Sequence, residues 1–339
     1  MNRYGWKWYK KDLCIDKDVK VFSTFSCGGG SSMGYKRAGF DVIGNVEIDP
    51  KMNDLYITNH HPKYNYCQDL REFNKREDLP DELIGIDILD GSPPCTSFST
   101  AGVRDRDWGK AKKFREGQNV QTLDDLFFVF LDTVEKLQPK IVVAENVTGL
   151  VTGKAKGYVN LIIKRFHELG YQVQIFKLNA ALMDVPQARE RVFFIANRMG
   201  YPKLRLEFDH DIILFRDCRV ERGREFAKDQ AIAKTLLENA NAKDRNLEHT
   251  LKRMTGEKGK YYSWMLVKDD QVVPTVTSGG YYFRFCDKTI MADDDFRNVQ
   301  TFPQDYNFKK QSAQYVCGMS VPPNMMANIA TEIYEQWLR

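Results

Sequence analysis

The 339-residue chain has no long apolar run, and this limits where it can act. No stretch is long enough to span a bilayer, and the N-terminal MNRYGWKWYKKDLCIDKD lacks the apolar centre of a signal peptide. The seven cysteines are odd in number and irregularly spaced, which is typical of a reducing compartment rather than of a disulfide framework. We therefore expect a cytoplasmic protein with no membrane partner.

Metal ligands in the usual spacings are also missing. No two cysteines form a CxxC pair, and the five histidines do not cluster with cysteines, so we expect no metal site. There is no internal repeat and no large excess of charge of one sign. The net charge of +4, from 50 basic and 46 acidic residues, permits a polyanionic partner without requiring one.

What the sequence does contain is an alternation of strand-like and helix-like segments through about residue 197. Short apolar runs predict strands at 19–25, 41–49, 84–92, 141–147, 171–180 and 191–198. Helix-like stretches at 32–40 and 122–138 lie between them. This order predicts an α/β fold with a doubly wound, Rossmann-like sheet. Past residue 198 the pattern becomes charged and irregular, so we expect a second, smaller domain there.

A glycine run, FSTFSCGGGSSMG (22–34), joins the first strand to a helix. Glycines at this place let backbone amides approach a ligand at the positive end of the helix dipole. Glu47 ends the second strand about 20 residues on, where its carboxylate can accept both hydroxyls of a ribose. Ile48 would cover one adenine face, and Asp69 would accept from the adenine amino group. The set predicts a nucleoside cofactor, NAD or S-adenosylmethionine.

A cysteine stands on a stiff segment in DGSPPCTSFSTAG (90–102). The prolines at 93 and 94 fix φ, and small residues follow Cys95, so the thiol is presented on a rigid arm with open surroundings. The plain alternative is a proline-rich turn that happens to contain a cysteine. A nucleophilic cysteine would also suit an NAD-dependent aldehyde dehydrogenase.

Further polar residues are expected near that cysteine. Glu145 and Asn146 end another strand, at the carboxyl edge where doubly wound folds keep their ligands. Arg189 and Arg191 alternate on the way into the apolar VFFIA, so both side chains are expected to point the same way. The alternative for the arginines is ordinary surface charge.

Together, FxxGGG, EID, PPC, ENV, QARER and GMSV, in this order, resemble the DNA cytosine-5 methyltransferase family over residues 19–335. The resemblance implies S-adenosylmethionine as the cofactor. It also implies that Cys95 is the nucleophile, that Glu145 assists at the base, and that Arg191 with Arg189 helps to hold the base. The positions that would contact the cofactor are Phe25, Gly29, Gly30, Glu47, Ile48, Asp69 and Pro94.

The same resemblance divides the chain. Residues 1–197 match the catalytic and cofactor-binding domain, 198–272 the target-recognition domain, and 273–339 a return to the first domain that ends in a helix. It also implies a prokaryotic or phage-encoded enzyme of a restriction-modification system. We expect such an enzyme to act as a monomer on double-stranded DNA.

Three positions depart from the family pattern. Cys27 stands where the first glycine of the loop is usual, which puts that turn in doubt. Thr96 follows the nucleophile where glutamine is common. Met319 replaces the asparagine of the usual GNSV pattern, so we expect Ser320 and its backbone to make the cofactor contact instead.

Two basic stretches are candidates for DNA contact, because the target base must leave the duplex and the opened duplex must be held. The first, 101–118, follows the nucleophile and includes Arg104, Arg106 and Lys112. The second, 251–264, combines Lys252 and Arg253 with aromatic residues, and its alternative is an exposed hairpin.

Two other functions are alternatives to DNA methylation. A transfer RNA cytosine-5 methyltransferase would carry a Cys-Phe-Thr signature, and no cysteine here is followed by Phe-Thr. A non-catalytic DNA-binding relative would have lost Cys95, Glu145 or the arginines, and all are present.

Overall fold

The computed structural model describes residues 2–94, 111–112, 121–122, 126–152 and 156–339. Its chain forms two compact units. The sheet unit comprises Leu13–Asn179, Glu190–Glu207 and Met325–Arg339. The second unit comprises Met1–Asp12, Ala180–Arg189 and Phe208–Asn324.

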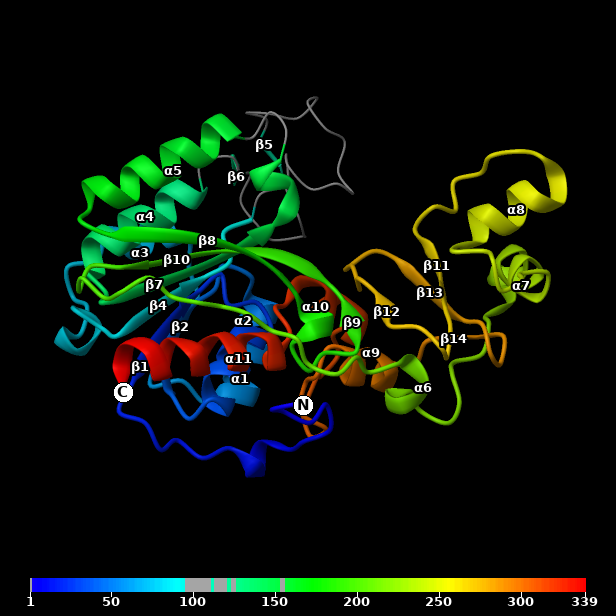
Figure 1. The fold of residues 1–339 in the computed structure, drawn as a ribbon, viewed down its shortest axis with the longest axis horizontal. Helices are drawn as coiled ribbons and strands as arrows, with labels where there is room; N and C mark the ends of the chain where they lie inside the picture. Colours follow the sequence, from blue (N-terminus) through cyan, green and yellow to red (C-terminus); the bar gives the residue numbers. More distant parts are fainter. Residues whose placement is uncertain (1, 95–110, 113–120, 123–125, 153–155) are drawn as a thin grey trace. The chain divides into compact units, whose positions relative to one another are not determined.

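A seven-stranded sheet forms the centre of the sheet unit (Figure 1). In spatial order the strands are β3 (Tyr64–Tyr66), β2 (Asp41–Val46), β1 (Lys20–Thr24), β4 (Ile88–Gly91), β7 (Ile141–Val147), β10 (Glu190–Asn197) and β8 (Gln172–Asn179). Strand β10 is antiparallel to both of its neighbours, and every other pair in this sheet is parallel. The chain leaves β1 on one side towards β2 and returns on the other at β4. The β1–β4 pair is therefore the switch point at which doubly wound sheets bind ligands.

Helices cover both faces of this sheet (Figure 1). On one face lie α3 (Leu70–Asn74), α4 (Leu126–Leu137) and α5 (Lys156–Glu168), and on the other α1 (Gly30–Arg37), α2 (Pro50–His60) and α11 (Pro323–Ile333). The α3–α5 face packs on a continuous apolar core that includes Phe22, Phe130 and Phe194. Shorter elements of the sheet unit are η2 (Asp81–Leu83), β5 (Ala111–Lys112), β6 (Gln121–Thr122), η5 (Thr148–Val151) and the π-helical turn η9 (Tyr334–Leu338).

The second unit has smaller sheets and short helices. A three-stranded sheet has the order β11 (Trp264–Val267), β13 (Tyr281–Arg284) and β14 (Thr289–Ile290), and β9 (Gln187–Ala188) pairs with β12 (Val273–Pro274). The helices are η1 (Lys10–Asp12), η7 (Ala180–Leu182), α6 (Phe215–Cys218), η8 (Lys228–Gln230), α7 (Ala231–Glu238), α8 (Leu247–Thr255), α9 (Asp293–Val299) and α10 (Ala313–Met319). A separate apolar cluster, which includes Leu237, Leu247 and Phe283, holds α7 and α8 on the three-stranded sheet.

The structure confirms the predicted α/β class and the doubly wound sheet. Each predicted strand is present, and the predicted helix at 122–138 is α4, although Thr122 lies in β6. The 251–264 stretch is not a hairpin: it begins within α8, which Gly256 ends with φ of 76°, and reaches Trp264 at the start of β11. The domain bounds 1–197, 198–272 and 273–339, with their roles, stay predictions.

Candidate active site

The glycine loop turns sharply between β1 and α1. Phe25, Cys27 and Gly29 all have positive φ, at 52°, 45° and 75°. At Gly29 a Cβ atom would lie 2.1 Å from Nε2 of His60, so only glycine fits there. Cys27 adopts the left-handed conformation that a glycine would take without strain, and backbone strain of this kind is often found at functional sites. Gly30 opens α1, so its end of the helix faces the loop.

Glu47 fastens this loop to the end of β2. Its Oε2 accepts from the Cys27 N–H at 2.7 Å and its Oε1 from the Asp49 N–H at 2.9 Å. Burial raises the pKa of Glu47, and these backbone donors offset part of that rise. An ionised carboxylate has about four acceptor sites, so the side chain can still accept from a ligand's hydroxyl in addition to these backbone donors. Ile48 beside it is half-buried.

Three asparagines that were not among the predicted site residues form a hydrogen-bonded cluster, which supports the glycine loop through Ser26. Asn45 donates to Ser26 Oγ at 3.0 Å and to Asn53 Oδ1 at 3.3 Å. Asn65 in turn donates to Asn45 Oδ1 at 2.8 Å and to Asn53 Oδ1 at 2.7 Å. Asn45 and Asn65 pair in register on β2 and β3, and Asn53 lies on α2, so the signal in the sequence is an asparagine inside an apolar run such as DVIGNV.

Asp69 has a structural role, and its predicted contact with adenine stays a prediction. It caps α3, because its Oδ1 accepts from the Arg71 N–H at 2.8 Å. Its Oδ2 lies 3.4 Å from Nη1 of Arg71. The side chain is half-buried, and the predicted adenine contact would use the oxygen that does not cap the helix.

The segment that leads to Cys95 leaves the sheet at the end of β4. Pro93 is buried, and its carbonyl accepts from Nδ2 of Asn146 at 3.0 Å. Pro94 is half-buried and is the last residue described before Cys95. Cys95, with Thr96, Arg104 and Arg106, lies outside the described residues, so their predicted roles stay predictions. The backbone of Lys112 belongs to β5, and its DNA contact also stays a prediction.

Glu145 and Arg191 form a largely buried ion pair. Oε1 of Glu145 lies 2.9 Å from Nε of Arg191, and the side chains are 11% and 14% exposed. Arg191 pairs in register with Val147 on the antiparallel β7, which brings its side chain back towards Glu145. Because Ala144 pairs with Gly91 of β4, this ion pair lies at the sheet edge where the Pro93–Pro94 segment leaves. A carboxyl group and a guanidinium are thus presented together beside the arm that leads to the cysteine.

Arg189 has partners different from those of Arg191. Its guanidinium donates to the carbonyls of Val276 at 3.0 Å and Gly318 at 3.1 Å, and the residue is buried. The sequence reading expected the two arginines to act alike on alternate positions. The structure gives Arg189 backbone partners within the second unit, so its role at the base stays a prediction.

Ser320 is buried in the second unit, just after α10. Its carbonyl accepts from Nε2 of Gln300 at 2.8 Å. Its hydroxyl is buried and makes no hydrogen bond to the part of the chain that the structure describes. A buried hydroxyl without a partner is costly, so this atom fits a ligand contact. Met319, which replaces the usual asparagine, is 48% exposed.

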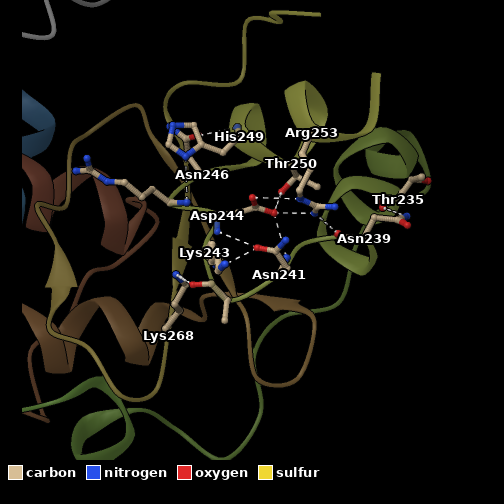
Figure 2. Close-up of polar contacts among 12 residues, drawn as sticks. Thr235, Asn239, Asn241, Lys243, Asp244, Asn246, His249, Thr250, Arg253 and Lys268 are labelled. Atoms are coloured by element: carbon tan, nitrogen blue, oxygen red, sulfur yellow. Dashed lines mark hydrogen bonds and ion pairs between the residues drawn. The ribbon is translucent and has the colours of Figure 1, made fainter. Parts of the chain in front are cut away.

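Arg253 of α8 contacts Asp244 and Asn239, in the segment that precedes this helix (Figure 2). Its Nη2 donates to Asp244 Oδ2 at 2.8 Å and to the Asn239 carbonyl at 2.6 Å. Burial acts to raise the pKa of Asp244, but hydrogen bonds from Arg253, the Asn241 N–H and Thr250 outweigh it and hold that pKa below its ordinary value. Lys252 beside it is exposed. The two basic residues are therefore not equivalent.

Comparisons with known proteins agree with the resemblance seen in the sequence motifs. A model of the C-5 cytosine-specific DNA methylase family matches residues 19–335. The chain is 34% identical over 215 residues to the type II methyltransferase M.FnuDI of Fusobacterium nucleatum, which covers 62% of this chain and 54% of that protein. It is 28% identical over 360 residues to M1.HphI of Haemophilus parahaemolyticus, covering 95% and 88%. The chain thus spans about half the length of M.FnuDI and most of M1.HphI.

Solved structures agree on the fold. A DNA modification methyltransferase described from an Escherichia coli prophage superposes with a TM-score of 0.69 at 20% identity, covering 95% of this chain and all of that one. Spodoptera frugiperda DNMT2 gives a TM-score of 0.65 at 15% identity, with 94% of this chain covered. Identities this low show a shared fold. Among the helices that the structure describes, none has the length and apolar character to cross a membrane.

Proposed function

We propose, since the chain belongs to the C-5 cytosine-specific DNA methylase family, that it transfers a methyl group from S-adenosylmethionine to carbon 5 of cytosine in duplex DNA. The observation that carries the proposal is the Glu145–Arg191 pair at 2.9 Å, beside the segment that leads to Cys95. The family is one of DNA methylases and the matched relatives are type II methyltransferases, which favours DNA over transfer RNA and the methyl donor over NAD.

The proposed reaction starts at the thiol. The thiolate of Cys95 adds to carbon 6 of cytosine, which breaks the aromaticity of the ring and makes carbon 5 nucleophilic. In its protonated form, Glu145 gives a proton to ring nitrogen 3 as charge develops there, and Arg191 meets the carbonyl oxygen. S-adenosylmethionine, when bound, supplies an electrophilic methyl group on its sulfonium. A base then takes the proton from carbon 5, and the thiolate leaves.

The residues of the glycine loop fit the cofactor. The backbone of Gly29 and Gly30 would contact it at the amino end of α1, where Gly30 opens the helix. Glu47 would accept from the ribose hydroxyls, with Ile48 against the adenine. The other proposed contacts are Phe25, Asp69, Pro94 and Ser320, the last through a hydroxyl that has no other described partner.

The segment 198–272 is proposed to recognise the target sequence, because no residue assigned to the chemistry lies in it. Lys252 and Arg253 would contact the duplex there, and Arg104, Arg106 and Lys112 would contact it beside the nucleophile. We further propose that the protein acts as a monomer in the cytoplasm of a prokaryotic or phage-infected cell, within a restriction-modification system.

Bisulfite sequencing of plasmid from cells that express the protein tests the proposed function directly. Protected cytosines at one recurring short sequence are the expected result. A plasmid whose cytosines all convert, from cells in which the folded protein is abundant, would refute methylation of DNA. Protection found only in transfer RNA would move the proposal to the other branch of the family.

Glu47→Ala is expected to weaken binding of S-adenosylmethionine by about 1–3 kcal/mol, because the ribose hydroxyls lose a charged acceptor. Asp69→Asn should also weaken it, since the amide keeps one oxygen to cap α3 but offers no second acceptor. Isothermal titration calorimetry measures both. Asp41→Ala, at the exposed amino end of the same β2 strand, is the matched control and should bind normally. Normal affinity in both test variants would remove these residues from the cofactor site.

If Lys252 contacts a phosphate, Lys252→Ala is expected to weaken binding to cognate and unrelated duplexes alike. The slope of the logarithm of affinity against the logarithm of salt concentration should become shallower by about one. Arg253→Ala should in addition lower the melting temperature, because Asp244 loses a charged donor. Gel-shift titrations at two salt concentrations, with thermal melts, separate the two effects. Lys234→Ala, an exposed lysine on α7, is the control. Unchanged affinity of Lys252→Ala would exclude this contact.

A further inference from the structure

Asp90 is a buried carboxyl group that the proposed reaction does not use. It is the penultimate residue of β4 and only 2% exposed. Its position pairs with Ser23 of β1, so it lies at the switch point of the sheet. An acidic side chain is rarely buried unless it serves a purpose, since burying its charge costs free energy.

The side chain and backbone of Asp90 tie β4 to two other elements. Its Oδ2 accepts from Ser23 Oγ at 2.9 Å, and its Oδ1 from the Tyr35 hydroxyl of α1 at 3.3 Å. Its main-chain carbonyl accepts from Thr24 Oγ1 at 3.1 Å. One residue thus joins the end of β4 to β1 and to the helix that follows the glycine loop.

The residues after Asp90 are held closely as well. At Gly91 a Cβ atom would lie 2.5 Å from Phe130 and 2.6 Å from Thr24 Oγ1, so this backbone has no room to shift on that side. Two residues later, the Pro93 carbonyl accepts from Asn146. The segment is therefore fastened at Asp90 and again at Pro93, and Cys95 comes directly after Pro94 in the chain.

The surroundings of Asp90 bring its ionisation close to neutrality. The net pKa of Asp90 is raised to about 7: burial raises it most, hydrogen bonds from the Ser23 and Tyr35 hydroxyls lower it, and the Glu145 carboxylate of β7 raises it. Burial also raises the pKa of Tyr35, and the charge of Asp90 adds to that rise. The pKa of Tyr56 of α2 is also raised by burial and by the charge of Asp90. On β10, Arg191 faces Glu145 rather than Asp90.

We propose that Asp90 is a positioning residue whose ionised carboxylate holds Gly91–Pro94 in the arrangement that methyl transfer needs. The inference rests on the proposed function. An ionised carboxylate accepts from both hydroxyls at once, whereas the protonated group must donate and gives up or reverses one of those bonds. Methyl transfer therefore falls as the pH drops through the ionisation of Asp90.

The same group has the opposite effect on stability. The pKa of Asp90 in the folded protein lies above the ordinary value of about 4, so the folded state binds more protons than the unfolded state between about pH 4 and 7. The contribution of Asp90 to the free energy of unfolding therefore falls as the pH rises through that window and is constant above it. A group that only stabilised the fold would not give activity and stability opposite pH trends.

Asp90→Asn tests this, because the amide has the same shape and cannot ionise. At about pH 8 we expect kcat to fall about ten- to hundredfold, with the KM for S-adenosylmethionine within about threefold of the wild type. The ionisation of Asp90 should disappear from the pH profile of kcat, and the melting temperature of the wild type relative to that of the variant should fall as the pH rises towards about 7. Tritiated methyl transfer and thermal melts from about pH 5.5 to 8.5 measure both.

Asp87→Asn is the matched control. Asp87 also joins β1 to its neighbour, through the Lys20 N–H at 2.8 Å and Lys140 Nζ at 2.7 Å, but just before the amino end of β4. This variant should keep the wild-type pH profile of kcat. If Asp90→Asn does not fold, Tyr35→Phe replaces it: losing one donor should move the ionisation to higher pH.

An Asp90→Asn enzyme with the wild-type kcat and pH profile would overturn the inference alone. So would a Tyr35→Phe profile that does not move. A wild-type protein that methylates no duplex at any pH would instead overturn the proposed function, and the inference with it.

Discussion

Replacing Cys95 by serine is expected to reduce methyl transfer to background while binding of S-adenosylmethionine and duplex DNA persists. A thiol with a pKa of about 8.5 supplies a few per cent of thiolate near neutrality, and a serine hydroxyl supplies almost no alkoxide. Without an anion to add at carbon 6, carbon 5 stays a poor nucleophile. Tritiated methyl incorporation, with calorimetry for the cofactor, measures the two properties separately.

Cys14→Ser is the matched control for that experiment, because Cys14 is a free, exposed thiol in the same unit. It should turn over like the wild type. Measurable turnover by Cys95→Ser, with Cys14→Ser and the wild type as references, would remove Cys95 from the role of nucleophile.

Glu145→Gln is expected to lower kcat by about 10²–10⁴-fold, because the amide cannot give a proton to ring nitrogen 3. The glutamine oxygen can still accept from Nε of Arg191, so the largely buried guanidinium keeps a partner and the fold should survive. Duplex affinity in a gel shift should stay close to that of the wild type. Melting curves check that the loss is one of chemistry.

Glu190→Gln provides the comparison. Glu190 is the neighbour of Arg191 on β10 and forms an exposed ion pair with Lys177 at 3.0 Å. Neutralising it should leave kcat unchanged, since exposed pairs contribute little. A Glu145→Gln enzyme that kept near-normal turnover would show that proton donation comes from elsewhere.

Most strands of the sheet were predictable, because strands such as β1, β4 and β7 are short apolar runs that end in polar residues, whereas β3 is only Tyr64–Tyr66 and has no such run. The direction of β10 was not predictable in the same way. Its run RVFFIA is buried, and a strand buried on both faces has the same pattern whether it is parallel or antiparallel. The direction of β10 matters at the candidate active site, because the antiparallel pairing brings Arg191 back beside Glu145.

The candidate site was predictable where a residue type at a strand end has one obvious use. Glu47 after β2 and Glu145 near the end of β7 are of this kind. Residues with competing partners were harder: Asp69 caps a helix, and Arg253 holds Asp244. A charged residue in a sequence does not reveal whether a neighbour already satisfies it.

The burial of Asp90, in contrast, was not predictable from the sequence. At the end of an apolar run, before Gly and Ser, an aspartate is typical of a strand that enters a solvated loop. Only the pairing of β4 with β1 and the position of Tyr35 show that its carboxyl group is buried and bonded on two sides. Contacts between residues 55 and 67 positions apart in the chain leave no local pattern.

The most direct test of the account is a trapping experiment with duplex DNA that carries 5-fluorocytosine at the methylated position. Fluorine cannot leave carbon 5 as a proton does, so the enzyme should stop as a covalent complex once the methyl group has been transferred. The account predicts a complex stable to denaturant, formed only with S-adenosylmethionine present, and a DNA-linked peptide that contains Cys95. A complex mapped to another cysteine, or none from a protein that methylates the normal duplex, would contradict it.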